Sequence, residues 1–327
     1  MQNRRLGRSA IAVPPLGMGC WAIGGPFTYE AIQAGWGEVD DAESALAIER
    51  ALESGITLFD TAAAYGTGHS ERVLGRTLGA RRSGVVIATK FGFAIDETKR
   101  HVAHHPDRRQ IVANARADCE ASLRRLGTDV IDLFQLHDGS LPLEWVPELL
   151  VVLEDLVAEG KIRTYGWSTD SPEGARAFAT GAHCVAIQHD LNVVLDAPEM
   201  LHVCAELNLA SVNRTPLARG ALTGKYTRDT VFAANDVRND PWAIDNILRP
   251  AFDQLEALRE ILTSDGRTLA QGALAWIWAR SPLTIPIPGI RTVRQLEENA
   301  GALALGPLTA GQLGQIDAIL KRPAPTR

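Results

Sequence analysis

Eight short runs of apolar and β-branched residues alternate with amphipathic stretches along the whole chain. This alternation restricts the fold strongly, because strands that are each followed by a helix build a parallel sheet with helices on its faces. The strand-like runs span residues 16–19, 57–60, 85–90, 132–137, 164–168, 185–188, 210–213 and 284–287. The stretches expected to be helices span residues 41–54, 71–78, 108–126, 144–159, 172–180, 198–207, 251–262 and 293–302.

Eight strand–helix units in 327 residues favour closure of the sheet into a (β/α)8 TIM barrel. No change of composition and no linker divides the chain, so we expect residues 1–327 to form one domain. An open doubly wound sheet is the alternative fold. Its usual dinucleotide fingerprint, GxGxxG after the first strand, is absent, because Gly17, Gly19, Gly24 and Gly25 do not have that spacing.

Composition excludes several classes of partner. The formal net charge is -6 and the chain has no long run of Lys or Arg, which argues against nucleic acid and anionic membranes. No stretch reaches the roughly 20 apolar residues that span a bilayer, and the N-terminus has no apolar segment typical of a signal peptide. We therefore expect a cytoplasmic protein with no membrane association. The sequence leaves open whether it forms a homo-oligomer.

The residues that usually bind metals do not form a motif in this chain. The four cysteines lie far apart without a CxxC pair, so we expect reduced, buried thiols. His101, His104 and His105 cluster in a long expected loop but have no cysteine or carboxylate framework around them. We expect no metal site.

Polar residues stand at the carboxyl ends of five expected strands. In a barrel these ends converge on one mouth, where active sites are built. Each residue alone has a structural explanation, such as a helix cap, an ion pair or a histidine in the core. Together they predict a catalytic site. The five residues are Asp60, Lys90, His137, Ser168 and Gln188.

Tyr65 follows Asp60 by five residues and adds a phenol to this group. Reduction of a carbonyl by hydride requires a proton for the developing alkoxide, and a phenol with a pKa of about 10 is a weak acid unless its anion is stabilised. The Lys90 ammonium group would provide this stabilisation while Asp60 holds the lysine. His137 would orient the carbonyl at the same place.

At these residues the chain resembles the aldo-keto reductase superfamily, from Leu6 to about Ala300. The resemblance implies Asp60, Tyr65, Lys90 and His137 as the catalytic residues, with Tyr65 as the general acid. It also implies a hairpin near residues 4–13 that closes the bottom of the barrel. The motifs that carry the resemblance are residues 19–25, 59–62, 65–66, 68–71, 88–90, 132–137, 166–168, 216–220, 222–225 and 287–289 with Glu298 and Asn299.

The resemblance further implies NADP(H) in an extended form across the barrel mouth, without a Rossmann unit. Ser168 and Gln188 would hold the nicotinamide carboxamide, but Thr169 stands where the family often has Asn. Arg214 stands where many members stack an aromatic ring on the nicotinamide. A guanidinium can stack as well, although its charge would disfavour the oxidised cofactor. The complete set of expected cofactor contacts is Trp21, Asp60, Ser168, Gln188, Arg214, Pro216, Leu217, Arg219, Gly220, Lys225, Gly289, Arg291, Gln295, Glu298 and Asn299.

Within this set, residues 216–225 resemble the loop that meets the pyrophosphate, and Arg291 stands at a helix start where it suits a 2′-phosphate. We therefore expect NADP(H) over NAD(H). Trp21, Tyr65, Phe91 and His137 are expected to line the substrate pocket, with Phe93 and Trp242 as further candidates. The tryptophans within helical patterns, Trp145, Trp276 and Trp278, are expected in the core.

These expectations predict an NADP(H)-dependent reductase of an aldehyde or ketone, acting on a small carbonyl or sugar substrate. Two alternatives remain. If the same residues catalysed the reverse reaction, the protein would be an NAD(P)-dependent aldose or alcohol dehydrogenase. A relative of the potassium-channel β subunits would keep barrel and nucleotide and serve as a regulatory binding partner. Two stretches longer than ordinary loops, residues 91–106 and 226–250, are expected to be functional lids or mobile segments.

Overall fold

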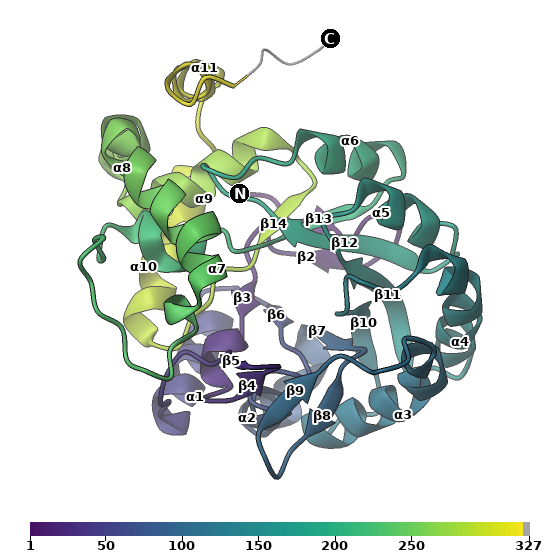
Figure 1. The fold of residues 1–327 in the computed structure, drawn as a ribbon. Helices are drawn as coiled ribbons and strands as arrows, with labels where there is room; N and C mark the ends of the chain where they lie inside the picture. Colours follow the sequence, from purple (N-terminus) through teal and green to yellow (C-terminus); the bar gives the residue numbers. More distant parts are fainter. Residues whose placement is uncertain (323–327) are drawn as a thin grey trace.

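The computed structural model describes residues 1–322, which form an eight-stranded parallel sheet surrounded by helices (Figure 1). The order along the sheet is β14-β13-β12-β11-β10-β7-β6-β3. Its two edges meet, because Gly17 N donates to Pro286 O at 3.0 Å and Gly19 N donates to Pro288 O at 2.9 Å. The predicted closed barrel is confirmed. Its strands are β3 (Met18–Gly19), β6 (Leu58–Asp60), β7 (Val86–Phe91), β10 (Ile131–Leu136), β11 (Ile162–Ser168), β12 (Cys184–Asp190), β13 (Ala210–Arg214) and β14 (Thr284–Pro286).

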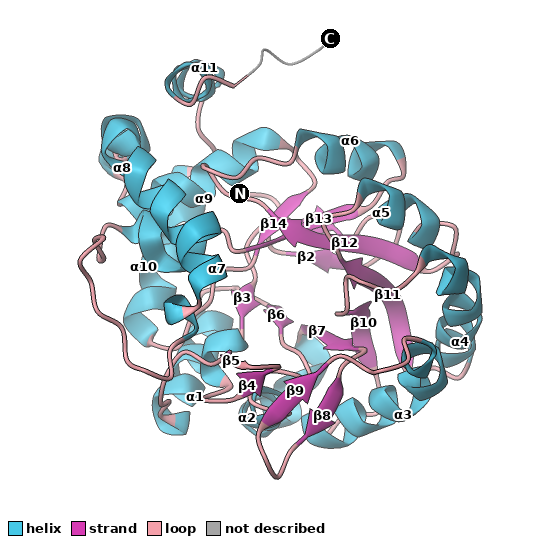
Figure 2. Ribbon diagram, in the orientation of Figure 1, coloured by secondary structure: helices cyan, strands magenta, loops and turns pink. Residues whose placement is uncertain are grey.

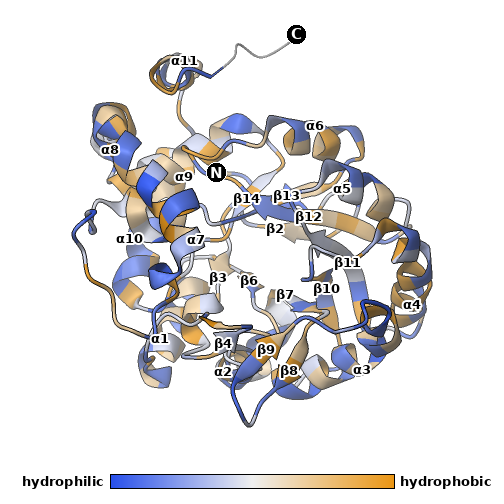
Figure 3. Ribbon diagram, in the orientation of Figure 1, coloured by the Kyte–Doolittle hydropathy of each residue, from blue (hydrophilic) through white to orange (hydrophobic). Residues whose placement is uncertain are grey.

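Helices form a ring outside the strands (Figure 2). Most of them carry both hydrophobic and hydrophilic residues (Figure 3), because one face packs inward and the other meets solvent. Eight of them match the predicted stretches: α1 (Asp41–Glu53), α2 (His69–Leu78), α3 (Arg109–Leu126), α4 (Val146–Ala158), α5 (Pro172–Phe178), α6 (Pro198–Glu206), α8 (Arg249–Leu262) and α10 (Val293–Leu305).

Two further helices, α9 (Leu269–Arg280) and α11 (Ala310–Ile319), were not predicted. Residues 269–278 of α9 are buried on almost every side, so the helix has no polar face and no amphipathic pattern. The start of each helix does have a sequence signal. Thr268 with Gln271, and Thr309 with Gln312, form capping boxes at the two N-termini.

Within residues 1–322, eight short helical turns lie between the longer elements. Most connect a strand to the following helix at the rim of the barrel. They are η1 (Trp21–Ile23), η2 (Gly79–Gly84), η3 (Leu143–Trp145), η4 (Ala218–Thr223), η5 (Val237–Asn239), α7 (Pro241–Ala243), η6 (Ile244–Leu248) and η7 (Ser264–Gly266).

The expected hairpin closes the amino end of the barrel. Strands β1 (Arg4–Arg5) and β2 (Ala12–Val13) pair antiparallel, and Leu6 and Val13 pack in one buried cluster with side chains from the strands. The turn approaches the sheet so closely that a Cβ on Gly7 would lie 2.2 Å from Val185 O. Gly7 also has a φ of +51°, so both space and backbone conformation require glycine there.

The first long stretch at the carboxyl end, residues 91–106, contains two strands of its own. Strands β8 (Ala94–Asp96) and β9 (His101–Ala103) form a hairpin, and β9 pairs with β4 (Thr28–Tyr29), which pairs with β5 (Ile32–Gln33). This four-stranded sheet lies beside the mouth of the barrel (Figure 1). It joins segments more than 60 residues apart, a pairing that local sequence does not reveal.

The second long stretch, residues 226–250, also crosses towards the segment that follows β5. Trp36 and Asp236 form an antiparallel bridge, and Val237 N donates to Gly35 O at 2.7 Å. The stretch contains η5, α7 and η6. All four cysteines are buried with free thiols, as expected, and no helix within residues 1–322 has the length and apolarity to cross a bilayer.

Candidate active site

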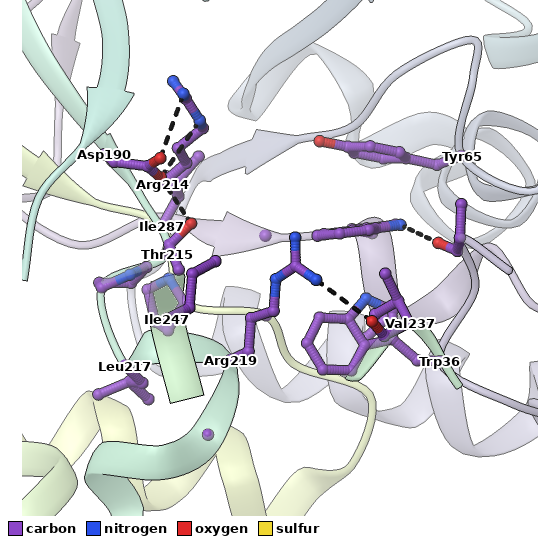
Figure 4. A pocket seen from close by; sticks show the side chains of 18 of the residues that line it. Trp36, Tyr65, Asp190, Arg214, Thr215, Leu217, Arg219, Val237, Ile247 and Ile287 are labelled. Atoms are coloured by element: carbon purple, nitrogen blue, oxygen red, sulfur yellow. Dashed lines mark hydrogen bonds and ion pairs between the residues drawn. The ribbon is translucent and has the colours of Figure 1, made fainter. Parts of the chain in front are cut away.

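A cavity of about 970 Å³ opens at the carboxyl ends of the barrel strands, and Figure 4 shows part of its lining. Every residue predicted to contact the cofactor lines this cavity, as do Tyr65 and His137. Lys90 is fully buried and contacts the site through its hydrogen bond to Tyr65. The structure therefore brings the predicted catalytic residues and the predicted cofactor residues to the same hollow.

Lys90 on β7 donates three hydrogen bonds. They run from Nζ to Asp60 Oδ1 at 2.5 Å, to the backbone oxygen of Thr61 at 2.8 Å and to Tyr65 Oη at 3.1 Å. Burial lowers the pKa of Lys90, but the nearby Asp60 and Tyr65 outweigh this effect and raise the pKa above its ordinary value. Lys90 is therefore a cation at neutral pH with all three of its protons engaged.

The second oxygen of Asp60 is also held. Gln188 Nε2 donates to Asp60 Oδ2 at 2.7 Å, and Gln135 Nε2 donates to the same oxygen at 3.2 Å. Gln135 was not predicted as a site residue. A polar side chain within the apolar run of β10 could have indicated it. The side-chain nitrogen of Gln188 bonds within the protein, so its side-chain oxygen, Oε1, is left to bind a ligand.

Tyr65 accepts a hydrogen bond from Lys90, so its own proton is free for a group in the cavity. Burial raises the pKa of Tyr65, and the charge of Lys90 opposes this rise without overcoming it. The turn that presents the phenol depends on Gly66, which has a φ of +59° and where a Cβ would lie 1.8 Å from Gly24 O. The Tyr65 ring is stacked on Trp21 with 5.9 Å between centroids.

His137 follows β10 and stands edge-on to Tyr65, with 5.6 Å between ring centroids. Its Nδ1 atom is buried and has no hydrogen-bond partner among residues 1–322. Burial, aided by the charges of Lys90 and Arg214, holds the pKa of His137 well below its ordinary value. The imidazole is therefore neutral at physiological pH.

The prediction that Phe91 lines the substrate pocket is wrong. Phe91 is 2% exposed and stacks on Phe134 at 4.3 Å between centroids, in the core outside the barrel strands. Successive residues of a strand point to opposite faces, so when Lys90 points into the site Phe91 points away from it. Phe93 lines the cavity instead, 5.1 Å from the His137 ring. Trp242 also lines it, and Trp276 and Trp278 lie in the core as predicted.

Arg214, at the end of β13, is held by two carboxylates that were not predicted. Its guanidinium group is paired with Asp170 and with Asp190, and it donates to Gln188 O at 3.1 Å. Thr215 Oγ1 donates to Asp190 Oδ1 at 2.7 Å (Figure 4). Burial opposes the charge of Arg214, but the two carboxylates raise its pKa. They also offset its positive charge, which weakens the expected penalty against an oxidised nicotinamide nearby.

The loop after β13 has an unusual backbone. Thr215, Ala218 and Arg219 have φ values of 55°, 47° and 53°, and Gly220 has 94°. Left-handed conformations at non-glycine residues are strained and cluster at functional sites. The Arg219 side chain reaches across the cavity, with its guanidinium group 5.5 Å from the Trp21 ring and a hydrogen bond of 3.3 Å to Val237 O (Figure 4).

The far end of the cavity carries two cationic side chains. Lys225 pairs with Glu298 at 3.0 Å, and Arg291 Nη1 donates to Trp36 O at 3.1 Å. Arg291 lies just before α10, whose N-cap Thr292 accepts from Gln295 N. This end therefore combines a helix N-terminus with positive charge, an arrangement that favours anions.

Fold and site together define a TIM barrel with a tyrosine, a lysine, an aspartate and a histidine grouped at its carboxyl mouth. The profile of the Aldo/keto reductase family matches residues 15–321. The chain belongs to this family.

Three similar proteins illustrate the range of the family. The NADH-specific methylglyoxal reductase of Escherichia coli is 31% identical, with 98% of each chain covered. The structure of a glycerol dehydrogenase from Gluconobacter oxydans is 31% identical with a TM-score of 0.80, covering 99% of this chain and 97% of that chain. An aldo-keto reductase from Klebsiella pneumoniae, solved in complex with NADPH, is 27% identical with a TM-score of 0.72, covering 99% and 96%.

Proposed function

We propose that this aldo/keto reductase reduces an aldehyde or ketone to an alcohol with NADPH, and that Tyr65 is the general acid. The observation that carries the proposal is the arrangement of Lys90. It donates to the Tyr65 oxygen, so it stabilises the phenolate that forms when Tyr65 loses its proton, and it leaves that proton free for a substrate.

The other site residues support this proton transfer. Asp60 offsets the buried charge of Lys90 and fixes its position, and Gln135 and Gln188 fix Asp60 in turn. Neutral His137, whose Nδ1 is without a partner within the described chain, would carry its proton on the other ring nitrogen and donate to the carbonyl oxygen. Tyr65 would then give its proton to that oxygen, so that hydride addition at the carbonyl carbon would leave an alcohol and a Tyr65 phenolate beside Lys90.

The residues present fit an extended dinucleotide. Residues 215–220 have a strained backbone, and such a loop offers amide groups to a pyrophosphate. Ser168 and the Gln188 carbonyl oxygen would hold the carboxamide. The Thr169 hydroxyl accepts a hydrogen bond from Ser171 N, so it is less available to bind the carboxamide. When bound, the reduced cofactor supplies the hydride.

Arg291 favours NADP(H) over NAD(H) in this proposal, because a guanidinium group suits bidentate contact with a 2′-phosphate. The NADPH-bound relative supports this choice and the NADH-specific relative opposes it. The likeness to a glycerol dehydrogenase makes oxidation of an alcohol the second candidate, since the same residues serve both directions. The intact Lys90–Tyr65 contact favours catalysis over a purely regulatory role.

We also propose that residues 1–327 act as one domain and that the protein works in a reducing, cytoplasmic compartment. The hairpin that closes the barrel and the contacts of α11 with α8 and α9 support the first point. The four buried free thiols support the second.

The test is a coenzyme oxidation assay of the purified protein with NADPH and, separately, NADH, against aldehydes, ketones and sugars. We expect NADPH-dependent activity that Tyr65→Phe lowers by at least about a hundredfold, the usual scale of general acid catalysis. Cofactor binding, followed by fluorescence titration, should be unchanged in that variant. Activity that survives Tyr65→Phe would refute the assigned role.

A further inference from the structure

A second chain of hydrogen bonds lies beside the proposed catalytic residues. Tyr29 Oη is 2.6 Å from His104 Nε2, and His104 Nδ1 is 2.7 Å from Asp138 Oδ2. The other Asp138 oxygen accepts from the backbone and hydroxyl groups of Ser140 at 2.8 and 2.6 Å. Arg108 Nε lies 3.6 Å from Asp138 Oδ2. The proposed mechanism uses none of these groups.

The carboxylate sets the direction of the hydrogen bond between His104 and Asp138. Asp138 is fully buried and, as a carboxylate, only accepts, so His104 donates from Nδ1. In the tautomer with a single proton, on Nδ1, the Nε2 atom accepts and Tyr29 donates its proton to it. Burial, followed by the charge of Asp138, raises the pKa of Tyr29 to about 12, so the phenol keeps this proton. The Tyr29 oxygen is left with lone pairs to offer.

The Tyr29 side chain lines the same cavity as Tyr65 and His137. The Phe93 ring stands between Tyr29 and His137, 5.4 Å from the first and 5.1 Å from the second, so one aromatic ring separates the phenol from the catalytic histidine. The neighbouring side chains that line this wall are apolar. They are Phe27, Ile32, Ala34, Ala64 and Val102.

A phenol oxygen held in an apolar wall is a selective acceptor, because a ligand hydroxyl that fails to meet it leaves a polar group without a partner. We propose that Tyr29, positioned by His104 and Asp138, binds a hydroxyl group of the substrate a few bonds from its carbonyl. The preferred substrates are then hydroxylated aldehydes or ketones rather than simple alkyl or aryl carbonyls. This inference rests on the proposed function.

The test compares two rigid aldehydes of similar size, 4-(hydroxymethyl)benzaldehyde and 4-methylbenzaldehyde, and a short pair, glyceraldehyde and propanal. We expect Tyr29→Phe to lower kcat/KM for the hydroxylated member of at least one pair by about 3- to 10-fold, the scale of one hydrogen bond. The loss should appear mainly in KM, and the methyl or alkyl member should stay within about twofold. His104→Phe should lower the same selectivity ratio by a smaller factor.

Tyr165→Phe is the matched control, because Tyr165 bonds Glu154 on the far side of the sheet from the cavity. Its selectivity ratio should equal that of the unaltered enzyme. If Tyr29→Phe lowers activity on both members of each pair equally, or changes neither, the hydrogen-bonded chain only supports the four-stranded sheet and the inference is overturned. Absence of activity on every aldehyde by the unaltered enzyme would instead count against the proposed function.

Discussion

Replacement of Lys90 by methionine removes both the structural role and the proposed chemical role of this residue. The change leaves Asp60, 2% exposed, without its counterion, and removal of one partner of a buried pair costs about 3–5 kcal/mol of folding free energy. It also removes the cation 3.1 Å from the Tyr65 oxygen, whose attraction for a phenolate is about 5 kcal/mol at an effective dielectric constant near 20. We expect kcat to fall by about a thousandfold.

The double variant Asp60→Asn with Lys90→Met distinguishes these effects. Asparagine is neutral, so no buried charge is left without a counterion. We therefore expect the double variant to recover much of the stability lost by Lys90→Met, while kcat stays low. Urea unfolding measures the stability, and coenzyme oxidation at saturating cofactor and substrate measures kcat. Arg125→Met serves as the control. It removes the counterion of the fully buried Glu71, which lies outside the site, and should lower stability with little change in kcat.

The outcome for the double variant decides the question. If its kcat returns to within about tenfold of the unaltered enzyme, the low activity of Lys90→Met reflects a damaged fold. The lysine would then have no chemical role in proton transfer by Tyr65.

Three further predictions follow from the charged groups. Arg214→Ala should weaken NADPH binding by about tenfold, since it removes the guanidinium group and leaves Asp170 and Asp190 facing the cavity; an unchanged affinity in a fluorescence titration would contradict the assignment. Because the pKa of His137 is well below its ordinary value, the imidazole gains no proton near pH 6.5, and the pH profile of kcat/KM should lack an inflection there; an inflection abolished by His137→Gln would refute this. Burial raises the pKa of Asp118 to about 6, so the folded protein binds this proton more tightly than the unfolded chain and stability falls as pH rises from about 4 to 6. Asp118→Asn should therefore raise the free energy of unfolding by about 1–3 kcal/mol at pH 8 and change it little at pH 4, as measured by urea unfolding; equal effects at both pH values would disprove the shift.

Much of the barrel and of its catalytic group is determined by local sequence. Strand and helix periodicity is a short-range pattern, and repeated strand–helix units leave few closed arrangements. Since the strands are parallel, Asp60, Lys90 and His137 at their carboxyl ends must reach the same mouth. The sequence therefore placed these three residues together without any knowledge of their contacts.

The contacts that tune the site were decided by the tertiary structure. Gln135 meets Asp60 across 75 residues, and Arg214 meets Asp170 across 44, because strand order and register bring them into reach. The direction of a side chain excluded Phe91 from the cavity. Likewise, Tyr29, His104 and Asp138 come from three separate segments, joined only when β4 and β9 pair beside the mouth. Such partners depend on which strands pair and on which face each residue points to, and these are properties of the folded chain as a whole.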